Sequence, residues 1–394
     1  MTTPHGFALY ASVGDELIRY EIDVKNAQLT RRESIQLPGN VQYLWPHPNR
    51  GFFYVSSTDG GSGSSGIKGT IHRLTALKVD PTQGQLSLHG AQQALPSRPI
   101  HNTVDATGRF ALTAYNNPSH ITVHRILADG SVGEMVASED KMDTGVFAHQ
   151  VLMTPGNRSA LLVTRGNNAS SEKAEEAGAL KFYHFNEGRL SSKASLHPGH
   201  SGLGYGPRHV DFHPTKPWMY ASIERQNTLH MHTLENDQVS KEPLFIKDTL
   251  SGPFHNIPRQ MCSAIHVHPN GRFVYLANRA DNTIESNGRK VFDKGENTLV
   301  VFSINPSTGE PTVIQHVESH LIHVRNFSFD PSGQLMVASS TSGIDVLENG
   351  SIRHKSAGLS VFRVAEDGKL SFVRQYDIDT PGIKSQFWSG IMTY

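Results

Sequence analysis

Residues 268–279 read HPNGRFVYLANR, a turn that contains proline and glycine followed by an apolar strand with a polar end. The pattern returns at the same length and without gaps in segments that begin at His47, Asp105, Thr154, His213 and Asp330. A further strand that ends in an acidic or glycine turn follows such segments, for example residues 359–368, LSVFRVAEDG. Short strands that recur between turns at a period of roughly 40 to 60 residues are typical of β-propeller blades.

A seventh, partial copy opens the chain at residues 6–30, where the second and third strands are present and the first is missing. Residues 384–394, at the other end, supply a candidate for the missing strand. The sequence therefore predicts an all-β, seven-bladed propeller that spans residues 1–394 as a single domain and is closed by pairing of the C-terminal strand with the N-terminal blade. This closure would remove the exposed edges of an open array of sheets. A pair of β-sandwiches or an open solenoid is the alternative architecture.

Three insertions interrupt the repeat, at residues 60–69, 166–178 and 280–297. Each of them follows the second strand of its copy. We therefore expect the insertions to lie on one face of the disc, where binding loops are commonly found.

Composition limits the partners of this chain. The 394 residues contain 36 Lys and Arg against 36 Asp and Glu, so we do not expect a nucleic acid or an anionic membrane as a partner, since either would select a basic face. There is no stretch of about 18 apolar residues, and the N-terminus lacks a basic stretch followed by an apolar run. The single cysteine, Cys262, excludes an intrachain disulfide. We expect a cytoplasmic protein, and its oligomeric state stays open.

Two positions of the repeat are expected to face the mouth of the propeller, because they lie at the same height on adjacent strands of one antiparallel hairpin. The position five residues before the turn segment holds Gln42, Ile100, His149, Arg208, Ser263 and Arg325. The last position of the segment holds Thr58, Asn116, Arg165, Glu224, Arg279 and Thr341. Four arginines around one mouth repel one another unless a carboxylate or a bound anion lies among them. The pattern predicts a pocket for a small anionic molecule, since guanidinium groups bind carboxylates and phosphates in a bidentate manner.

We assign hypothetical roles to residues at or beside the mouth of the propeller. The candidate catalytic residues are Glu224, His149, Arg208 and Arg279. The candidate substrate-binding residues are Arg165, Arg325, Asn116 and His101. Structural roles are the alternatives: the histidines could bond neighbouring blades, and Arg208 could form an ion pair with Glu224 that only supports the fold.

Neither a metal nor a cofactor is expected. The sequence contains no HExxH or CxxC motif, and the arginines expected at the mouth would disfavour a cation. No GxSxG nucleophile motif and no phosphate-binding glycine loop stand out.

Residues 202–229, GLGYGPRHVDFHPTKPWMYASIERQNTL, resemble the hallmark stretch of the seven-bladed lactonase family, which includes bacterial 6-phosphogluconolactonases and fungal carboxymuconate cyclases. Residues 263–284 and 323–340 resemble two further blades of that family, and the similarity extends over most of the chain. For the cyclases the resemblance implies a His, two Arg and a Glu as catalytic and binding groups, which by motif fall here on His149, Arg208, Glu224 and Arg279. The three insertions, and residues 382–388 in place of the usual Gly-Pro, depart from the family pattern.

Two enzyme functions are compatible with these residues. In lactone hydrolysis, Arg208 and Arg279 would hold the substrate anion and polarise the ring carbonyl. Glu224 or His149 would activate water, and the other would protonate the leaving alkoxide. In cycloisomerisation of a carboxymuconate, the substrate's own carboxylate would attack its double bond while the same side chains bind the remaining carboxylates and deliver a proton. We favour hydrolysis of a small anionic sugar lactone, because the closest motif resemblance is to the sugar-lactone branch. A non-catalytic propeller that binds proteins is the third alternative.

Overall fold

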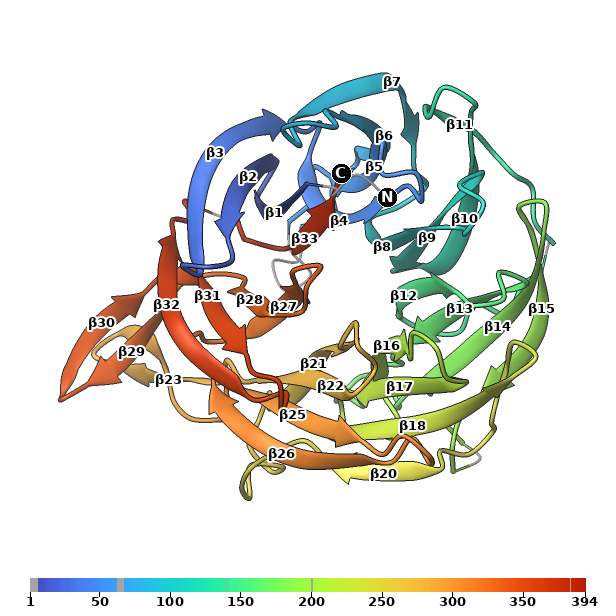
Figure 1. The fold of residues 1–394 in the computed structure, drawn as a ribbon. Coiled ribbons are helices and arrows are strands. Elements are labelled where there is room, and N and C mark those ends of the chain that lie inside the picture. Colours follow the sequence, from blue (N-terminus) through green and yellow to red (C-terminus); the bar gives the residue numbers. More distant parts are fainter. Residues whose placement is uncertain (1–5, 62–66, 140, 200, 383) are drawn as a thin grey trace.

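The structure is a computed structural model that describes residues 6–61, 67–139, 141–199, 201–382 and 384–394. Within these ranges the regular elements are all strands, and no helix is long and apolar enough to cross a membrane. Seven antiparallel sheets stand radially around a central axis (Figure 1). The prediction of an all-β, seven-bladed propeller is confirmed.

The strands of each blade are given from the innermost outward. The first three blades consist of β33 (Ser389–Thr393), β1 (Phe7–Val13), β2 (Glu16–Asp23) and β3 (Gln28–Gln36); of β4 (Asn40–Pro46), β5 (Phe52–Thr58), β6 (His72–Val79) and β7 (Leu86–Ala94); and of β8 (Pro99–Val104), β9 (Phe110–Asn116), β10 (Ser119–Ile126) and β11 (Val132–Met135). The fourth and fifth consist of β12 (Ala148–Met153), β13 (Ser159–Thr164), β14 (Ala179–Asn186) and β15 (Arg189–Leu196); and of β16 (Pro207–Phe212), β17 (Trp218–Ile223) and β18 (Thr228–Glu235), with both β19 (Gln238–Val239) and β20 (Phe245–Asp248) paired to β18. The sixth and seventh consist of β21 (Met261–Val267), β22 (Phe273–Arg279), β25 (Thr298–Ile304) and β26 (Pro311–Glu318); and of β27 (Val324–Phe329), β28 (Leu335–Ser340), β31 (Ala357–Val364) and β32 (Leu370–Ile378).

The C-terminal strand closes the ring. β33 pairs antiparallel with β1, so that Phe7 lies opposite Thr393 and Ala11 lies opposite Ser389. The prediction that the end of the chain supplies the innermost strand of the N-terminal blade is therefore confirmed.

The hydrophobic core lies between the blades. Seven clusters of buried side chains each join two neighbouring blades, and one of them joins the seventh blade to the first. Because side chains alternate along a strand, β5 directs Phe53 and Val55 toward the first blade and Tyr54 toward the third. The His-Pro turns add hydrogen bonds between blades, since His268 Nε2 lies 2.9 Å from Gly333 O and equivalent contacts are made by His47 and His213.

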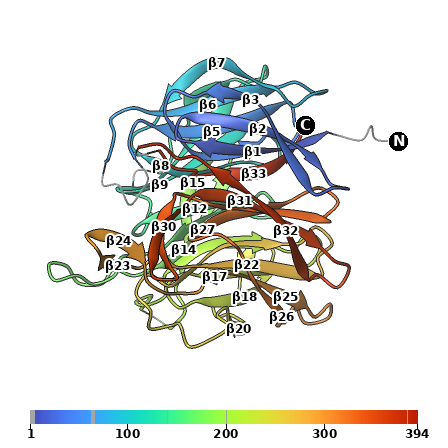
Figure 2. The same ribbon diagram turned by 90° about the vertical axis from the view of Figure 1, so that its left-hand side faces the viewer.

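A small eighth sheet projects from one face of the disc. It joins a hairpin of β23 (Thr283–Ser286) and β24 (Arg289–Phe292) to a hairpin of β29 (Ile344–Glu348) and β30 (Ser351–Lys355) through parallel pairing of β24 with β29. The first hairpin lies in the expected insertion at 280–297, whereas the second is an insertion after β28 that the repeat pattern did not reveal. In the edge-on view, β23 and β24 project from the same face as the loop between β13 and β14 (Figure 2).

A β-bulge occurs at the same place in five innermost strands. In blades two, three, four, five and seven the pairing register shifts at one residue of the first strand. The residue that the register omits is the one five before the turn segment, namely Gln42, Ile100, His149, Arg208 and Arg325. A bulge turns a side chain out of the regular alternation and is common beside active sites. It explains how a buried inner strand can hold polar side chains at this position.

Candidate active site

A pocket of about 270 Å³ lies where the inner strands meet. Most of the mouth positions predicted from the repeat line it, together with residues from the adjoining loops. Its lining residues are Arg98, Ile100, Asn116, Phe147, His149, Arg165, Glu224, Arg259, Met261, Arg279, His323, Arg325, Thr341, Ser342 and Phe387.

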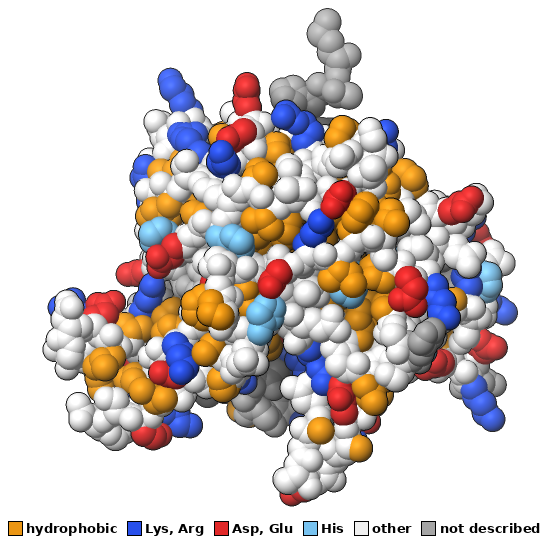
Figure 3. All heavy atoms as spheres, turned by 90° about the horizontal axis from the view of Figure 1, so that it is seen from below, with side chains coloured by type: hydrophobic (Ala, Val, Ile, Leu, Met, Phe, Trp, Pro, Cys, Tyr) orange, Lys and Arg blue, Asp and Glu red, His pale blue; other side chains and the backbone are white. Residues whose placement is uncertain are grey.

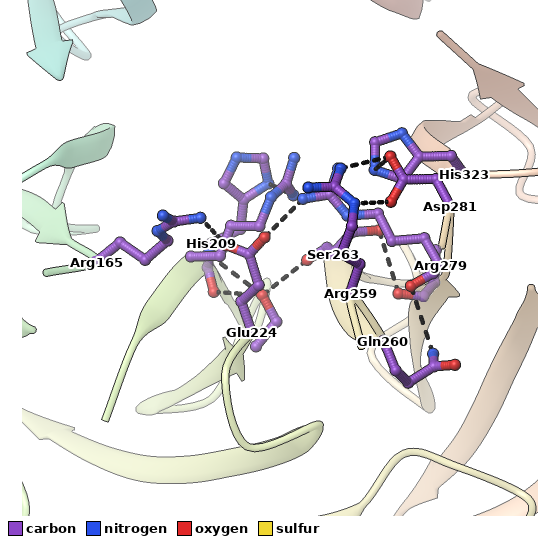
Figure 4. Close-up of polar contacts among 12 residues, drawn as sticks. Arg165, His209, Glu224, Arg259, Gln260, Ser263, Arg279, Asp281 and His323 are labelled. Carbon is purple, nitrogen blue, oxygen red and sulfur yellow. Dashed lines mark hydrogen bonds and ion pairs between the residues drawn. The ribbon is translucent and has the colours of Figure 1, made fainter. Parts of the chain in front are cut away.

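Glu224 is a buried carboxylate in the pocket wall, 1% exposed. Its Oε1 accepts a hydrogen bond from Arg279 Nη2 at 2.7 Å, and its Oε2 lies 3.6 Å from Arg165 Nη1. The two arginines approach Glu224 from opposite sides (Figure 4). Burial alone would raise the pKa of Glu224, but Arg279, Arg165 and Arg208 outweigh burial and lower the pKa to about 2. Glu224 is therefore ionised at neutral pH.

His149 lies in the same pocket and is 7% exposed. No hydrogen bond to either of its ring nitrogens is found among the described residues, and its ring stands edge-on to that of His209 with the centroids 5.0 Å apart. Burial lowers the pKa of His149 well below its usual value, and the positive charges of Arg208 and Arg325 lower it further. His149 is therefore neutral at pH 7 and has a nitrogen available to accept a proton.

Arg208 lies outside the pocket wall and is fully buried. Its Nη1 is 3.3 Å from His209 Nδ1, and in the described part of the chain its Nε and Nη2 have no hydrogen-bond partner. The alternative of an ion pair between Arg208 and Glu224 is not what the structure shows, because Glu224 pairs with Arg279 and Arg165. Burial, and then the charge of Arg279, lower the pKa of Arg208 to about 9, so Arg208 still contributes positive charge to the site at neutral pH.

His101 also lies outside the pocket wall. It is fully buried, its ring packs on Tyr43 with the centroids 3.7 Å apart, and it is 6.0 Å from the ring of His209. Neither ring nitrogen of His101 has a partner among the described residues. Buried polar atoms of this kind usually bond ordered water, so we expect water in the layer formed by His101, His209 and Arg208.

Arg325 and Arg98 have no carboxylate partner in the described part of the chain. Arg325 Nε donates to Phe387 O at 3.0 Å, and its guanidinium group lies over the Phe387 ring, 3.6 Å from the centroid. Arg98 donates from Nη2 to Gln42 Oε1 at 2.6 Å and from Nε to Gly61 O at 3.1 Å. These partners are neutral, so the positive charge of both arginines remains available to an anion.

Residues that the repeat positions did not identify complete the wall. Arg259 donates two hydrogen bonds to Asp281, from Nε at 2.5 Å and from Nη2 at 2.6 Å. His323 Nε2 lies 3.8 Å from Asp281 Oδ2 (Figure 4). Asp281 belongs to the insertion at 280–297, which therefore contacts two residues of the pocket wall.

Several of these missed residues share one position of the repeat, which lies two residues before the first of the two predicted mouth positions. The residue seven before the turn segment lines the pocket in four blades, where it is Arg98, Phe147, Met261 and His323. This position lies just before the first strand, or at its first residue in the case of Met261, so the alternation of that strand does not mark it.

The pocket region carries a surplus of positive charge. Six arginines lie in its wall or contribute charge to it, namely Arg98, Arg165, Arg208, Arg259, Arg279 and Arg325. They are opposed by two carboxylates, those of Glu224 and Asp281. On the face of the molecule shown in Figure 3, by contrast, side chains of both signs are interspersed. Among the described residues, no group of three or more His, Cys, Asp or Glu side chains is placed to hold a metal ion. The charges favour a small anion as the ligand.

Comparisons with known proteins agree with the propeller fold. The family model described as "Lactonase, 7-bladed beta-propeller" matches residues 7–348. The 6-phosphogluconolactonase of Bacillus subtilis (strain 168) is 27% identical over 336 residues, which make up 84% of this chain and 86% of that protein. The fold is shared with the periplasmic gluconolactonase PpgL of Pseudomonas aeruginosa, with a TM-score of 0.68 and 18% identity over 96% of this chain and 98% of that chain. It is also shared with a protein from Lactobacillus plantarum, with a TM-score of 0.72 and 18% identity over 99% of both chains. The chain therefore belongs to the lactonase family of seven-bladed β-propellers.

Proposed function

We propose that this protein hydrolyses a small anionic sugar lactone, of the kind for which its Bacillus relative is named, without a metal ion. The observation that carries the proposal is a pocket that combines a surplus of guanidinium groups with a neutral imidazole. The guanidinium groups attract an anionic substrate and repel a metal cation, which supports hydrolysis by side chains alone.

Arg325 and Arg98 bind the anionic group of the substrate, because they are the pocket-wall arginines without a carboxylate partner among the described residues. Arg165, whose side chain is 27% exposed, donates to the carbonyl oxygen of the lactone, where negative charge grows as water adds. Arg279 is nearly buried and holds Glu224 in place. This assignment differs from the expectation that Arg208 and Arg279 hold the anion, because those two side chains are the least accessible of the candidate arginines.

His149 serves as the general base. A carboxylate with a pKa of about 2 that pairs with two arginines is a weak base, whereas the neutral imidazole has no competing partner among the described residues. His149 takes a proton from a water molecule as the water oxygen bonds to the carbonyl carbon. When the ring C–O bond breaks, this proton passes to the leaving alkoxide oxygen, and His149 becomes neutral again. The product is an aldonic acid that ionises at neutral pH, so one proton is released per turnover.

Cycloisomerisation of a carboxymuconate is the second candidate. A substrate with several carboxylates would fit the same surplus of arginines, and His149 could move the proton.

We also propose a cytoplasmic location, which the buried free thiol of Cys262 supports.

The assay that tests this proposal offers the purified protein three substrates at neutral pH in the presence of EDTA: 6-phosphogluconolactone, unphosphorylated gluconolactone and carboxymuconate. Proton release reports opening of the lactones, and loss of ultraviolet absorbance reports loss of the conjugated diene. We expect the fastest turnover with the phosphorylated lactone and no effect of EDTA. Turnover of carboxymuconate alone would assign a cycloisomerase instead, and inactivity on all three would favour a non-catalytic binding platform.

A further inference from the structure

A second cavity lies beside the central pocket. It is lined in part by residues 67–69 of the first insertion, His72, Ser97 and Asn117, and it is termed the side cavity. Its volume is about 390 Å³, against about 270 Å³ for the central pocket. The side cavity is therefore too large to be a mere irregularity of the pocket wall, and hydrolysis of a one-ring lactone leaves it without a use.

The two cavities share a wall. Arg98, Asn116 and Phe147 line both of them. The side cavity therefore adjoins the pocket proposed for the lactone ring, and a longer ligand would reach it past these three side chains. The central pocket alone is slightly smaller than the range of about 300 to 1,000 Å³ that is usual for drug-sized ligands, whereas both cavities together lie well inside that range.

The side cavity presents polar groups that have no use inside the protein. His72 is 7% exposed and its Nδ1 lies 2.8 Å from Thr58 Oγ1, which leaves Nε2 without a partner among the described residues. Ser97 is half-buried and Asn117 is exposed, and neither side chain makes a hydrogen bond to any part of the chain that the structure describes. Unpaired groups that can donate and accept around a cavity suit a ligand with several hydroxyl groups.

Phe147 has an unfavourable backbone conformation at the point where the cavities meet. Its φ of 57° lies in the left-handed region, which is uncommon for bulky residues. The equivalent position of the fifth blade is occupied by Gly206, with a φ of 54°, and glycine adopts this conformation readily. Backbone strain of this kind is often found at binding sites. The ring of Phe147 lines both cavities and lies 4.5 Å from the Arg165 guanidinium carbon, so it gives both sites an apolar wall.

We propose that the side cavity is a second sugar subsite, so that the preferred substrate is an anionic lactone of an aldonic acid that carries one further sugar ring. This inference rests on the proposed function, because the lactone ring must occupy the central pocket. The apolar C–H face of the second ring packs against Phe147. Its hydroxyl groups bond His72, Ser97 and Asn117.

The test compares kcat/KM for 6-phosphogluconolactone with kcat/KM for the same lactone carrying a glucosyl residue on O4. Ser97→Trp fills the side cavity, and Ser87→Trp, on the exposed face of β7, is the matched control. We expect the wild type to prefer the two-ring lactone by about tenfold or more, and Ser97→Trp to lose that preference while its rate on the one-ring lactone stays within about twofold. Ser87→Trp should behave as the wild type. Should Ser97→Trp fail to fold, Asn117→Tyr carries the same expectation.

The failures of the subsite and of the proposed function are distinguishable. A wild type that hydrolyses the one-ring lactone but shows no preference for the two-ring lactone overturns the subsite and leaves the proposed function intact. An equal loss of kcat/KM for both lactones in a folded Ser97→Trp protein also overturns the subsite. Failure of the wild type to hydrolyse either lactone overturns the proposed function, and the subsite with it.

Discussion

Burial and neighbouring charge both lower the pKa of His149, whereas they have opposite effects on the pKa of Glu224. Burial disfavours the charged form of both groups, but the surrounding arginines disfavour only the imidazolium and favour the carboxylate. At neutral pH the site therefore holds a neutral base beside an ionised carboxylate. This difference, rather than the position of either residue in the repeat, is the reason why we propose His149 for the proton transfer.

The pH dependence of activity follows from this assignment. His149 acts in its neutral form and its pKa lies well below the ordinary value of 6.5, so activity is lost only when the pH falls through the lowered value. We expect kcat/KM to stay constant from about pH 7.5 to about pH 6 and to fall at lower pH. Initial rates corrected for spontaneous hydrolysis measure this profile. An acid limb centred at or above 6.5 would contradict the role of His149.

Glu224→Gln should reduce stability as well as activity, because the carboxylate is buried between two arginines. Removal of one partner from a buried ion pair costs about 3 to 5 kcal/mol of unfolding free energy. The folded-state pKa of about 2 is below the ordinary 4.5, so the carboxylate stabilises the fold above pH 4.5 and this contribution is lost as the pH falls toward 2. Urea unfolding at several pH values should show the difference between wild type and variant shrinking over that interval. A difference that does not change with pH would show that the charge of Glu224 is not what stabilises the fold.

At the scale of elements, the repeat predicted the three inner strands of the blades and the strand that closes the ring, because apolar alternation and turn residues mark those strands. It did not predict the bulges, since a shift of one residue in pairing leaves the sequence pattern unchanged. It also did not reveal the hairpin of β29 and β30. That segment, IDVLENGSIRHK from Ile344 to Lys355, has an Asn-Gly turn between short strands and looks like part of a blade.

The candidate site was predictable only where its residues belong to a strand of the repeat or directly follow one. Arg165, Glu224 and Arg279 come directly after or at the end of a second strand, so the repeat placed them in the wall. Arg259 and His323 come from loops with left-handed backbone, with φ of 60° and 61°, and no strand period extends to them. Arg208 was predicted at the mouth, but whether a bulged side chain enters the pocket or packs outside its wall depends on packing that the repeat does not encode.

The ring depends on strand β33, which closes the first blade by pairing with β1. The hydrogen bonds from Tyr394 N to Gly6 O and from Ser12 N to Trp388 O imply, by alternation along the ladder, that Met392 N also donates to β1. Met392→Pro removes that donor and should destabilise the fold by about 1 to 3 kcal/mol more than Met392→Ala, which keeps it. Chemical unfolding of both variants measures the difference. Equal stabilities would show that the pairing of β33 contributes little to closure.

At the scale of the whole molecule, seven interfaces between blades form a closed circle, and we propose that the ring folds as one domain. The chain has equal numbers of acidic and basic residues, yet the pocket region concentrates six arginines against two carboxylates. Cyclic repetition makes this concentration possible, because blades three to seven contribute side chains from equivalent inner positions to one shared centre. The ring thus concentrates positive charge at the pocket although the chain as a whole has no formal net charge.

The selection of an anionic substrate by unpaired guanidinium groups is tested most directly by one ratio: kcat/KM for 6-phosphogluconolactone divided by kcat/KM for gluconolactone. It is measured in the wild type, in Arg325→Gln and in Arg109→Gln, where Arg109 is an exposed control that pairs with Glu187 at 2.8 Å. The ratio should fall by about tenfold or more in Arg325→Gln and stay at the wild-type value in Arg109→Gln. An unchanged ratio in a folded Arg325→Gln protein would contradict the account.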